Sequence, residues 1–561
     1  MFVRCMKNSN GTKYLRIVEN VWNKDKRRTC QKVLFTLGRL DELQETGQID
    51  SITRSLSRFC QKLHLVDMSK DVSVEQAYVY GSVYVLRKLF ERTPIQEIVE
   101  EVSRIHQQME IPFVEAVFAM IVSRFVKPCS KLSLKERWLD RLYPELIRVK
   151  LPLHHLYRSL DLLAEHKEEI QKRLIYPEAQ HSLFEAPRLE VVFYDTTTLR
   201  FESVRVDKGA LRRFGYSKEM RTDCTQVILG LMLDYEGLPV GYKLFAGNTY
   251  EGKTLPIILK ELKDTYHIQR LIFVADRGII STKNLEEVAK AGFEFIMGMK
   301  LWAASSKEVE RILKIDEWDY VSENYKVKEL EHPDGRLVVT WSRERAQRDV
   351  KVRTDVIKKL QMKLSHDNRP EKLISHRGYG KYLKVLTQGK VAIDEDAILK
   401  ESRRDGLFGI LTNVAKSDLS AQQIVERYKE LWKIEDAFGE IKGMLEARPM
   451  FHWTDKRIEG HMMICFLAYY LEAFVTKEIR KMGVDFSASA AFDALNQVRA
   501  IPVTVRGQTV WVRTKIEGIA AKLMQILKIQ IPGDVLKLPS KNKHGVSNFS
   551  PNGNSYINST T

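Results

Sequence analysis

The sequence predicts an α/β protein in which a mixed sheet is preceded and followed by helices. Between residues 189 and 300, three strand-like segments are followed by a helix, a strand, a helix and a strand. Apolar residues at i, i+3 and i+4 precede this region from about residue 75 to 180, and the same spacing returns from Ser420 to Leu445 and from Ile458 to Lys481. We therefore expect a sheet that is covered by helices.

Composition indicates a globular protein with a polyanionic partner. A chain of 561 residues is long enough for two to four structural units. Its 90 Lys and Arg exceed its 73 Asp and Glu, for a formal charge of +17. Such an excess favours nucleic acid, although a membrane surface or ribosomal RNA would satisfy the same charge.

The cysteines and apolar runs indicate a reducing, cytoplasmic location. The six cysteines include no C-x-x-C pair, so neither a disulfide framework nor a structural zinc site is indicated. The longest apolar run, Met462 to Leu471, is too short to span a bilayer, and the N-terminus has no apolar signal segment. We expect no membrane contact.

The sequence divides into six expected segments. They are a basic β-rich N-terminal region at 1–70, a helical domain at 71–185, the first part of the sheet domain at 186–300, a β-rich insertion at 301–405, the second part of the sheet domain with C-terminal helices at 406–532, and a disordered tail at 533–561. Residues 1–40 carry ten Lys and Arg and two Asp and Glu, a local charge of 10 − 2 = +8. We expect the N-terminal region to bind DNA, although a solvated hairpin would show the same pattern.

Two apolar strands each lead into an aspartate, at Val191–Asp195 and Leu271–Asp276. The order β-β-β-α-β-α-β is that of an RNase H-like core, in which these two strands are adjacent and parallel. Asp195 and Asp276 should then lie side by side, and two carboxylates that close repel each other unless a cation lies between them. Oxygen ligands favour Mg²⁺ or Mn²⁺. The alternative is that each aspartate only forms a turn or a helix cap.

A third carboxylate lies on a later helix. Tyr428, Glu435 and Lys442 are seven residues apart, and at about 100° per residue they return to within roughly 20° of one another on a helix. A carboxylate between a phenol and an ammonium suits a metal ligand flanked by phosphate contacts. A solvated helix face would give the same spacing.

With these blocks, the chain resembles the Asp-Asp-Glu transposases of bacterial insertion sequences, in the branch with a Tyr-x2-Arg-x3-Glu-x6-Lys signature. The matching stretches are Phe193 to Thr197, Val274 to Gly278 and Tyr428 to Lys442. The signature arginine falls on Leu431 here, so its phosphate contact is not carried over, and Arg427 or Lys433 would have to replace it. The separations, 276 − 195 = 81 and 435 − 276 = 159, leave room for the β-rich insertion of this branch.

The resemblance implies a DNA transposase. Asp195, Asp276 and Glu435 would hold two Mg²⁺ ions, with Mn²⁺ as a substitute, which activate water to cut the element's end and then activate the freed 3′-hydroxyl to attack target DNA. The implied partner is double-stranded DNA, both terminal inverted repeats and target. The implied assembly is a homodimer in the bacterial cytoplasm, associated with the nucleoid.

Six further residues are expected to contact DNA. They are Tyr428, Lys442, Arg277, Arg212, Arg213 and Trp302. Trp302 is the nearest candidate for the family's tryptophan that stacks on a flipped base during a hairpin step. A structural ion pair, a solvated charge or a buried strand-end tryptophan is the alternative for the arginines and Trp302.

Two other functions remain open on the sequence alone. One is a nuclease with the same core that cuts without joining. The other is a catalytically silent, DNA-binding descendant, for which Leu431 argues and against which the intact triad argues.

Overall fold

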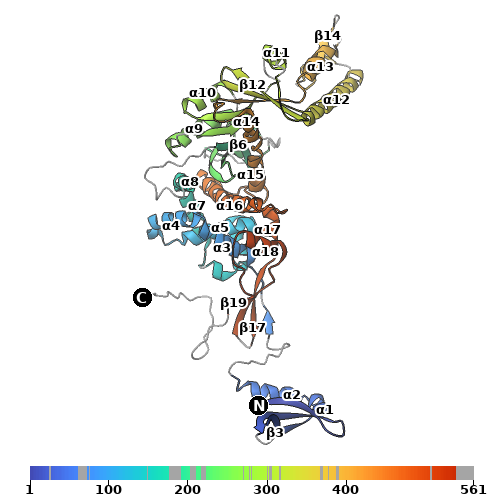
Figure 1. Cartoon of the computed structure of the whole chain (residues 1–561). Coiled ribbons are helices and arrows are strands. Elements are labelled where there is room, and N and C mark those ends of the chain that lie inside the picture. Colours follow the sequence, from blue (N-terminus) through green and yellow to red (C-terminus); the bar gives the residue numbers. More distant parts are fainter. Residues whose placement is uncertain are drawn as a thin grey trace. The chain divides into compact units, whose positions relative to one another are not determined.

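The computed structural model divides the chain into two compact units (Figure 1). One unit comprises 1–77, 501–513 and 533–561, and the other comprises 78–500 and 514–532. The structure describes residues 1–23, 27–60, 72–74, 76–147, 149–175, 191–202, 210–216, 223–268, 271–276, 278, 281–299, 301, 306–314, 317–366, 370–376, 378–386 and 391–505, and 508–537.

The first unit contains the expected N-terminal β-ribbon. Its elements are β1 (Phe2–Lys7), β2 (Lys13–Asn23), β3 (Arg28–Arg39), α1 (Leu40–Glu45) and α2 (Gln48–Ser57). The three strands form an antiparallel sheet in the order β1-β2-β3. Val18 and Leu43 are buried, whereas Trp22 and Phe35 are exposed. These strands agree with the β-rich character expected of this region, and α1 and α2 add two helices to it.

A second sheet in this unit corrects the expected tail. Here β4 (Val72–Val74), β17 (Arg499–Val505), β18 (Gln508–Arg513) and β19 (Val535–Lys537) pair in the order β19-β18-β17-β4. Residues 535–537, which we expected to be disordered, form a strand because they pair with β18, where Trp511 lies opposite Lys537. Residues 538–561 lie outside the described part of the chain.

The second unit contains a helical region built around one apolar helix. Its helices are α3 (Gly81–Arg92), α4 (Ile95–Ile105), α5 (Phe113–Val126), α7 (Leu153–Glu165), α8 (Lys167–Ile175), α16 (Asp455–Lys481), α17 (Ala488–Asn496) and α18 (Gly518–Ile526). Shorter helical turns lie at Gln107–Met109, Lys131–Ser133, Leu134–Trp138, Leu139–Arg141 and Pro144–Leu146. A short strand, β5 (Tyr78–Val79), pairs with Arg499 and Ala500.

The helical region does not stand apart from the C-terminal helices. Helix α16 packs against α5 and α7, and a Cβ on its Gly460 would lie 2.0 Å from the Leu160 carbonyl oxygen of α7. The expected separate helical domain at 71–185 is therefore wrong, because a helix that is apolar on all sides must be covered on all sides. By length and composition α16 could also cross a membrane, but 89% of its apolar window is buried in the protein.

A nine-stranded sheet forms the rest of the second unit, in the order β11-β12-β13-β16-β10-β9-β6-β7-β8. Its strands are β6 (Val191–Arg200), β7 (Gln226–Asp234), β8 (Pro239–Ala246), β9 (Ile272–Ala275), β10 (Glu294–Met299), β11 (Asp319–Ser322), β12 (Tyr325–His332), β13 (Gly335–Ser342) and β16 (Leu407–Thr412). Helix α9 (Thr254–Asp264) follows β8, and α10 (Thr282–Lys290) follows β9. The predicted order β-β-β-α-β-α-β is confirmed.

The expected β-rich insertion is a mixture of strands and helices. It contains α11 (Ser306–Lys314), α12 (Arg343–His366), α13 (Glu395–Ser402), the paired strands β14 (Leu383–Val385) and β15 (Val391–Ile393), and two short turns at Pro370–Leu373 and Gly380–Tyr382. Strands β11 to β13 do not form a separate sheet, because β13 pairs with β16 and extends the central one. Arg353 of α12 holds Asp405 through two hydrogen bonds of 2.5 Å.

The two faces of β6 have different neighbours. Val192 and Tyr194 lie in the apolar core with residues of α9 and α10. Because successive side chains of a strand point to opposite faces, Phe193, Asp195 and Thr197 share the other face. Helices α14 (Ala421–Lys429) and α15 (Trp432–Lys442) pack on that side of the sheet (Figure 1).

Candidate active site

The first two carboxylates follow matching positions of adjacent strands. Strands β6 and β9 are parallel, and Tyr194 lies opposite Ala275 as the last pair of their register. Asp195 and Asp276 come directly after this pair, so their backbones are neighbours, as the strand order predicted. One detail differs, because β6 continues to Arg200 and Asp195 therefore lies within a strand rather than at its end. Pairing of residues 192–200 with β7 sustains the longer strand.

Helix α15 lies over the face of β6 that carries Asp195. The Lys433 ammonium lies 5.8 Å from the centre of the Phe193 ring, and nine residues later the Lys442 ammonium donates to Thr197 Oγ1. Asp195 lies between these two contacts along β6 and therefore faces the helix. Glu435 is exposed in the first turn of α15.

The signature residues do not belong to one straight helix. Helix α14 ends at Lys429 and α15 begins at Trp432, with Leu431 between them. The Leu431 amide donates to the Tyr428 carbonyl at 3.1 Å. This bond spans three residues, as in a 3₁₀ turn, and not four as in an α-helix. The expected common helix face is therefore wrong. The sheet instead brings the residues together, since Lys442 contacts β6 and Tyr428 reaches Asp276.

Tyr428 is fixed directly against the second aspartate. Its hydroxyl donates to Asp276 Oδ1 at 3.1 Å, and its ring packs on Phe408 with centroids 5.2 Å apart. A Cβ on Gly298 of β10 would lie 2.3 Å from the Tyr428 hydroxyl oxygen, so only glycine leaves room for this side chain. We did not identify Gly298 from the sequence, although a glycine inside an apolar strand is a known signal of close approach.

The two proposed replacements for the missing arginine pack on the β7–β8 turn. The Arg427 guanidinium lies 3.9 Å from the centre of the Tyr235 ring. The Lys433 ammonium donates to the Tyr235 carbonyl at 2.6 Å and to Glu430 Oε2 at 2.9 Å. These contacts connect the break near Leu431 to the sheet. Lys433 is accordingly engaged within the protein.

The remaining expected DNA contacts have mixed positions. Arg212 is 2% exposed and stacks between Phe201 and Trp453, with centroid distances of 4.4 and 5.0 Å, so it holds its loop in place rather than facing solvent. Arg213 is partly buried and donates to the Arg212 carbonyl at 2.9 Å. Arg277 and Trp302 lie outside the described residues.

A buried arginine that the sequence did not reveal supports the segment after α15. Arg124 of α5 is 2% exposed and donates to the carbonyls of Leu445 and Glu446, both at 3.3 Å. Burial and, to a lesser extent, the charge of Arg124 lower the pKa of nearby Lys131 to about 7. In the sequence, a single arginine within the apolar segment of α5 is the feature that indicates a buried, hydrogen-bonded guanidinium.

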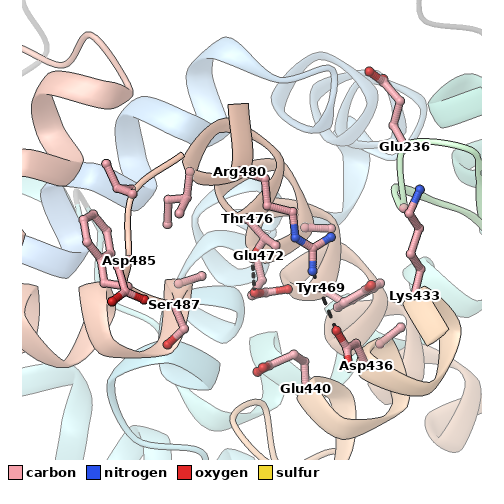
Figure 2. A pocket seen from close by; sticks show the side chains of 17 residues that line it. Glu236, Lys433, Asp436, Glu440, Tyr469, Glu472, Thr476, Arg480, Asp485 and Ser487 are labelled. Carbon is pink, nitrogen blue, oxygen red and sulfur yellow. Dashed lines mark hydrogen bonds and ion pairs between the residues drawn. The ribbon is translucent and has the colours of Figure 1, made fainter. Parts of the chain in front are cut away.

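A cavity of about 400 Å³ lies on another side of α15 (Figure 2). Asp436 and Glu440 enter it from α15, and Glu472 and Arg480 from α16. Arg480 pairs with Asp436 at 3.7 Å. Burial raises the pKa of Glu472 to about 7, although a hydrogen bond from Thr476 opposes the rise. These acids are separate from the proposed triad.

The three carboxylates do not meet at metal-ligand distance in this conformation. Among the described residues, one group of three or more His, Cys, Asp or Glu side chains has all its ligand atoms within 4.8 Å of one another, and it is His106, Glu165 and His166. The triad nevertheless offers only oxygen donors, the set that Mg²⁺ and Mn²⁺ prefer.

Comparison with known proteins identifies the family of the chain. The model of the transposase DDE domain matches residues 186–471, just over half of the chain, and that of the IS1634 family transposase N-terminal domain matches residues 3–70. No curated protein is significantly similar. Among solved structures, the chain is similar to the piggyBac transposase in a synaptic complex with hairpin DNA, at 10% identity and a TM-score of 0.36, over 75% of this chain and 82% of that chain. The chain therefore belongs to the DDE transposases of insertion sequences and is a DNA transposase.

Proposed function

We propose that Asp195, Asp276 and Glu435 are the catalytic carboxylates of this transposase, which cuts the ends of its element and joins the freed 3′-hydroxyl to target DNA. The observation that carries this proposal is the β6–β9 register, which makes Asp195 and Asp276 neighbours. The order of strands and helices supports an RNase H-like core around them. Helix α15 supplies Glu435 on the same side of the sheet.

The donor set fits two Mg²⁺ ions held by these three carboxylates. When bound, such ions activate a water or a 3′-hydroxyl and stabilise the leaving oxygen. The exposed side chains of Asp276 and Glu435 have to turn toward Asp195 for the ligands to gather, which their exposure allows. The Thr196 amide donates to Asp195 Oδ1 at 2.7 Å and fixes the carboxylate that is least able to move.

Two side chains assist the proposed carboxylates. Tyr428 holds Asp276 through its hydroxyl, so it acts through the carboxylate. Lys442 lies beside Thr197, two residues after Asp195, where its ammonium can contact a DNA phosphate. We assign these roles as positioning and phosphate binding, respectively.

The basic surfaces suit the terminal repeats and target DNA. In the N-terminal sheet Arg4 lies opposite Arg16, and Lys7 lies opposite Lys13. Like charges that face each other across strands destabilise a sheet, and bound phosphates would relieve that repulsion. Helix α12 adds eight Lys and Arg against three Asp and Glu. We propose that 1–70 binds the terminal repeats.

We further propose that a homodimer pairs two element ends in the bacterial cytoplasm, near the nucleoid. Each end needs one cutting and joining site, so two chains meet the requirement of a paired-end complex. Light scattering of the protein with short end fragments measures this directly. A mass of two chains and two fragments is expected, and one chain on one fragment would contradict it.

The experiment is a strand-transfer assay with Asp195→Asn, Asp276→Asn and Glu435→Gln. Supplied with precut 3′-hydroxyl ends and Mg²⁺, the wild type should form joined product, and each variant should lose it by more than about a hundredfold, because a ligand contributes at least as much as its supporting residues. Asp436→Asn is the matched control. Asp436 neighbours Glu435 but faces the cavity, so this variant should keep full activity.

The same assay, run on element ends that are still attached to flanking DNA, separates joining from cutting alone. Cut ends without joined product from the wild type would indicate a nuclease. Neither reaction from the wild type, with end binding intact, would indicate a silent DNA-binding protein. Normal joining by any of the three triad variants would overturn the residue assignment.

A further inference from the structure

The strongest additional feature is a group of two histidines and a glutamate in the helical region, on elements that carry none of the three carboxylates. His106 follows the last residue of α4. Glu165 is the last residue of α7, and His166 follows it as the cap before α8. The ligand atoms of all three lie within 4.8 Å of one another.

The two imidazoles point at each other. His106 Nε2 and His166 Nε2 are 2.7 Å apart, and the ring planes meet edge to face at 76°. Without a metal, a single proton shared between the two nitrogens satisfies this contact. A tetrahedral zinc ion with bonds of about 2.0 Å would hold its ligand atoms about 3.3 Å apart, so the two nitrogens need to move apart by about 0.6 Å to admit it.

We propose that His106, Glu165 and His166 form a binding site for a transition-metal ion, with Zn²⁺ as the best fit. Two imidazole nitrogens and one carboxylate oxygen suit zinc, whereas Mg²⁺ prefers oxygen donors alone. The site is therefore chemically distinct from the carboxylate triad. Water completes the coordination, or the exposed Glu169 one turn into α8 does.

The backbone around the site is already fixed. The His106 amide donates to the Ser103 carbonyl at 3.2 Å and the His166 amide to the Leu162 carbonyl at 3.0 Å, so both imidazoles extend from formed helix ends. Arg173 of α8 pairs with Glu97 of α4 at 3.3 Å and holds the two helices together beside the site. The metal would therefore bridge α4 to the α7–α8 junction and stabilise their contact.

One cation already competes for the site. The Lys456 ammonium, at the start of α16, pairs with Glu165 Oε2 at 3.2 Å. Both side chains are about half exposed, at 53% and 51%, so the pair opens at little cost. Zinc binding should displace Lys456 from that oxygen, and removing the ammonium should strengthen the binding of zinc.

The test is a zinc titration of the purified, chelator-stripped full chain in competition with a chromophoric indicator. The wild type should bind one ion that His106→Ala and His166→Ala bind about a hundredfold more weakly. Lys456→Ala should bind it more tightly than the wild type. Cobalt in place of zinc should give the intense visible absorption of a four-coordinate site, and both histidine variants should lose it.

A matched control uses another histidine pair. His154 and His155 at the start of α7 also meet edge to face, 4.3 Å between centroids, so His154→Ala removes a paired imidazole outside the site. It should leave zinc affinity unchanged. Equal zinc affinity in the wild type and the two site variants would overturn the proposal, as would equal loss in His154→Ala. Glu165→Gln, which keeps both imidazoles, should weaken zinc binding, and unchanged affinity would exclude the carboxylate as a ligand.

Discussion

Replacing Glu472 by glutamine should stabilise the protein above neutral pH. Glu472 is 4% exposed, lies in the cavity between α15 and α16, and accepts a hydrogen bond of 2.7 Å from Thr476. Burial is the main cause of its raised pKa, and the negative charge of Glu440 adds to it. A glutamine keeps the shape and the acceptor oxygen but carries no charge.

The magnitude follows from the two pKa values of Glu472. Its pKa rises from 4.5 to about 7 on folding, a difference of 7 − 4.5 = 2.5. Between these pH values the folded state keeps a proton that the unfolded chain has lost, so stability falls as pH rises. At about 1.4 kcal/mol for each pH unit, the loss is about 3 kcal/mol and is complete above pH 7.

Urea unfolding at pH 5 and pH 8, followed by tryptophan fluorescence, measures the effect. Glu472→Gln should match the wild type near pH 5 and exceed its unfolding free energy by about 3 kcal/mol at pH 8. Glu478→Gln on the same helix is the control, because Glu478 pairs with Lys481 near the surface and should leave the pH dependence unchanged. A Glu472→Gln variant with the same advantage at both pH values would refute the reasoning.

Three further predictions concern the site and its supports. Gly298→Ala should push Tyr428 away from Asp276 and reduce strand transfer, while DNA binding stays intact. Gly439→Ala is the control and should keep activity, because nothing lies within 4 Å of the added Cβ. The stability of the wild type should rise between pH 7 and 10, because in this range the unfolded chain keeps a proton that the buried Lys131, with its pKa near 7, has lost. Lys131→Met should abolish this rise. Arg353→Met should destabilise the insertion by about 3 kcal/mol, seen as faster limited proteolysis there; an unchanged rate would contradict a structural role for the ion pair.

The sequence predicted the parts of the site that depend on topology. Asp195 and Asp276 were expected to be neighbours because the strand after the first helix of this order pairs in parallel with the first strand. That expectation used the order of strands and helices and its likeness to an RNase H-like core. The register of β6 and β9 confirms it.

The parts that depend on distant packing were not predictable. The helix break at Leu431 is connected to Tyr235, a residue almost two hundred positions earlier, through Arg427 and Lys433. Local helix propensity contains no information about that contact. Likewise, helices α5 and α7 pack against α16 and bury its apolar surface. The helical region therefore forms one unit with the C-terminal helices and is not a separate domain.

The most direct test of the proposed site is metal rescue of a cysteine variant. Asp276→Cys places a thiolate, which binds Mn²⁺ better than Mg²⁺, at one expected ligand position. Strand transfer should be lost with Mg²⁺ and recover with Mn²⁺, while Asp436→Cys should be active with both. Full activity of Asp276→Cys with Mg²⁺ would contradict metal binding by this residue and, with it, the carboxylate triad.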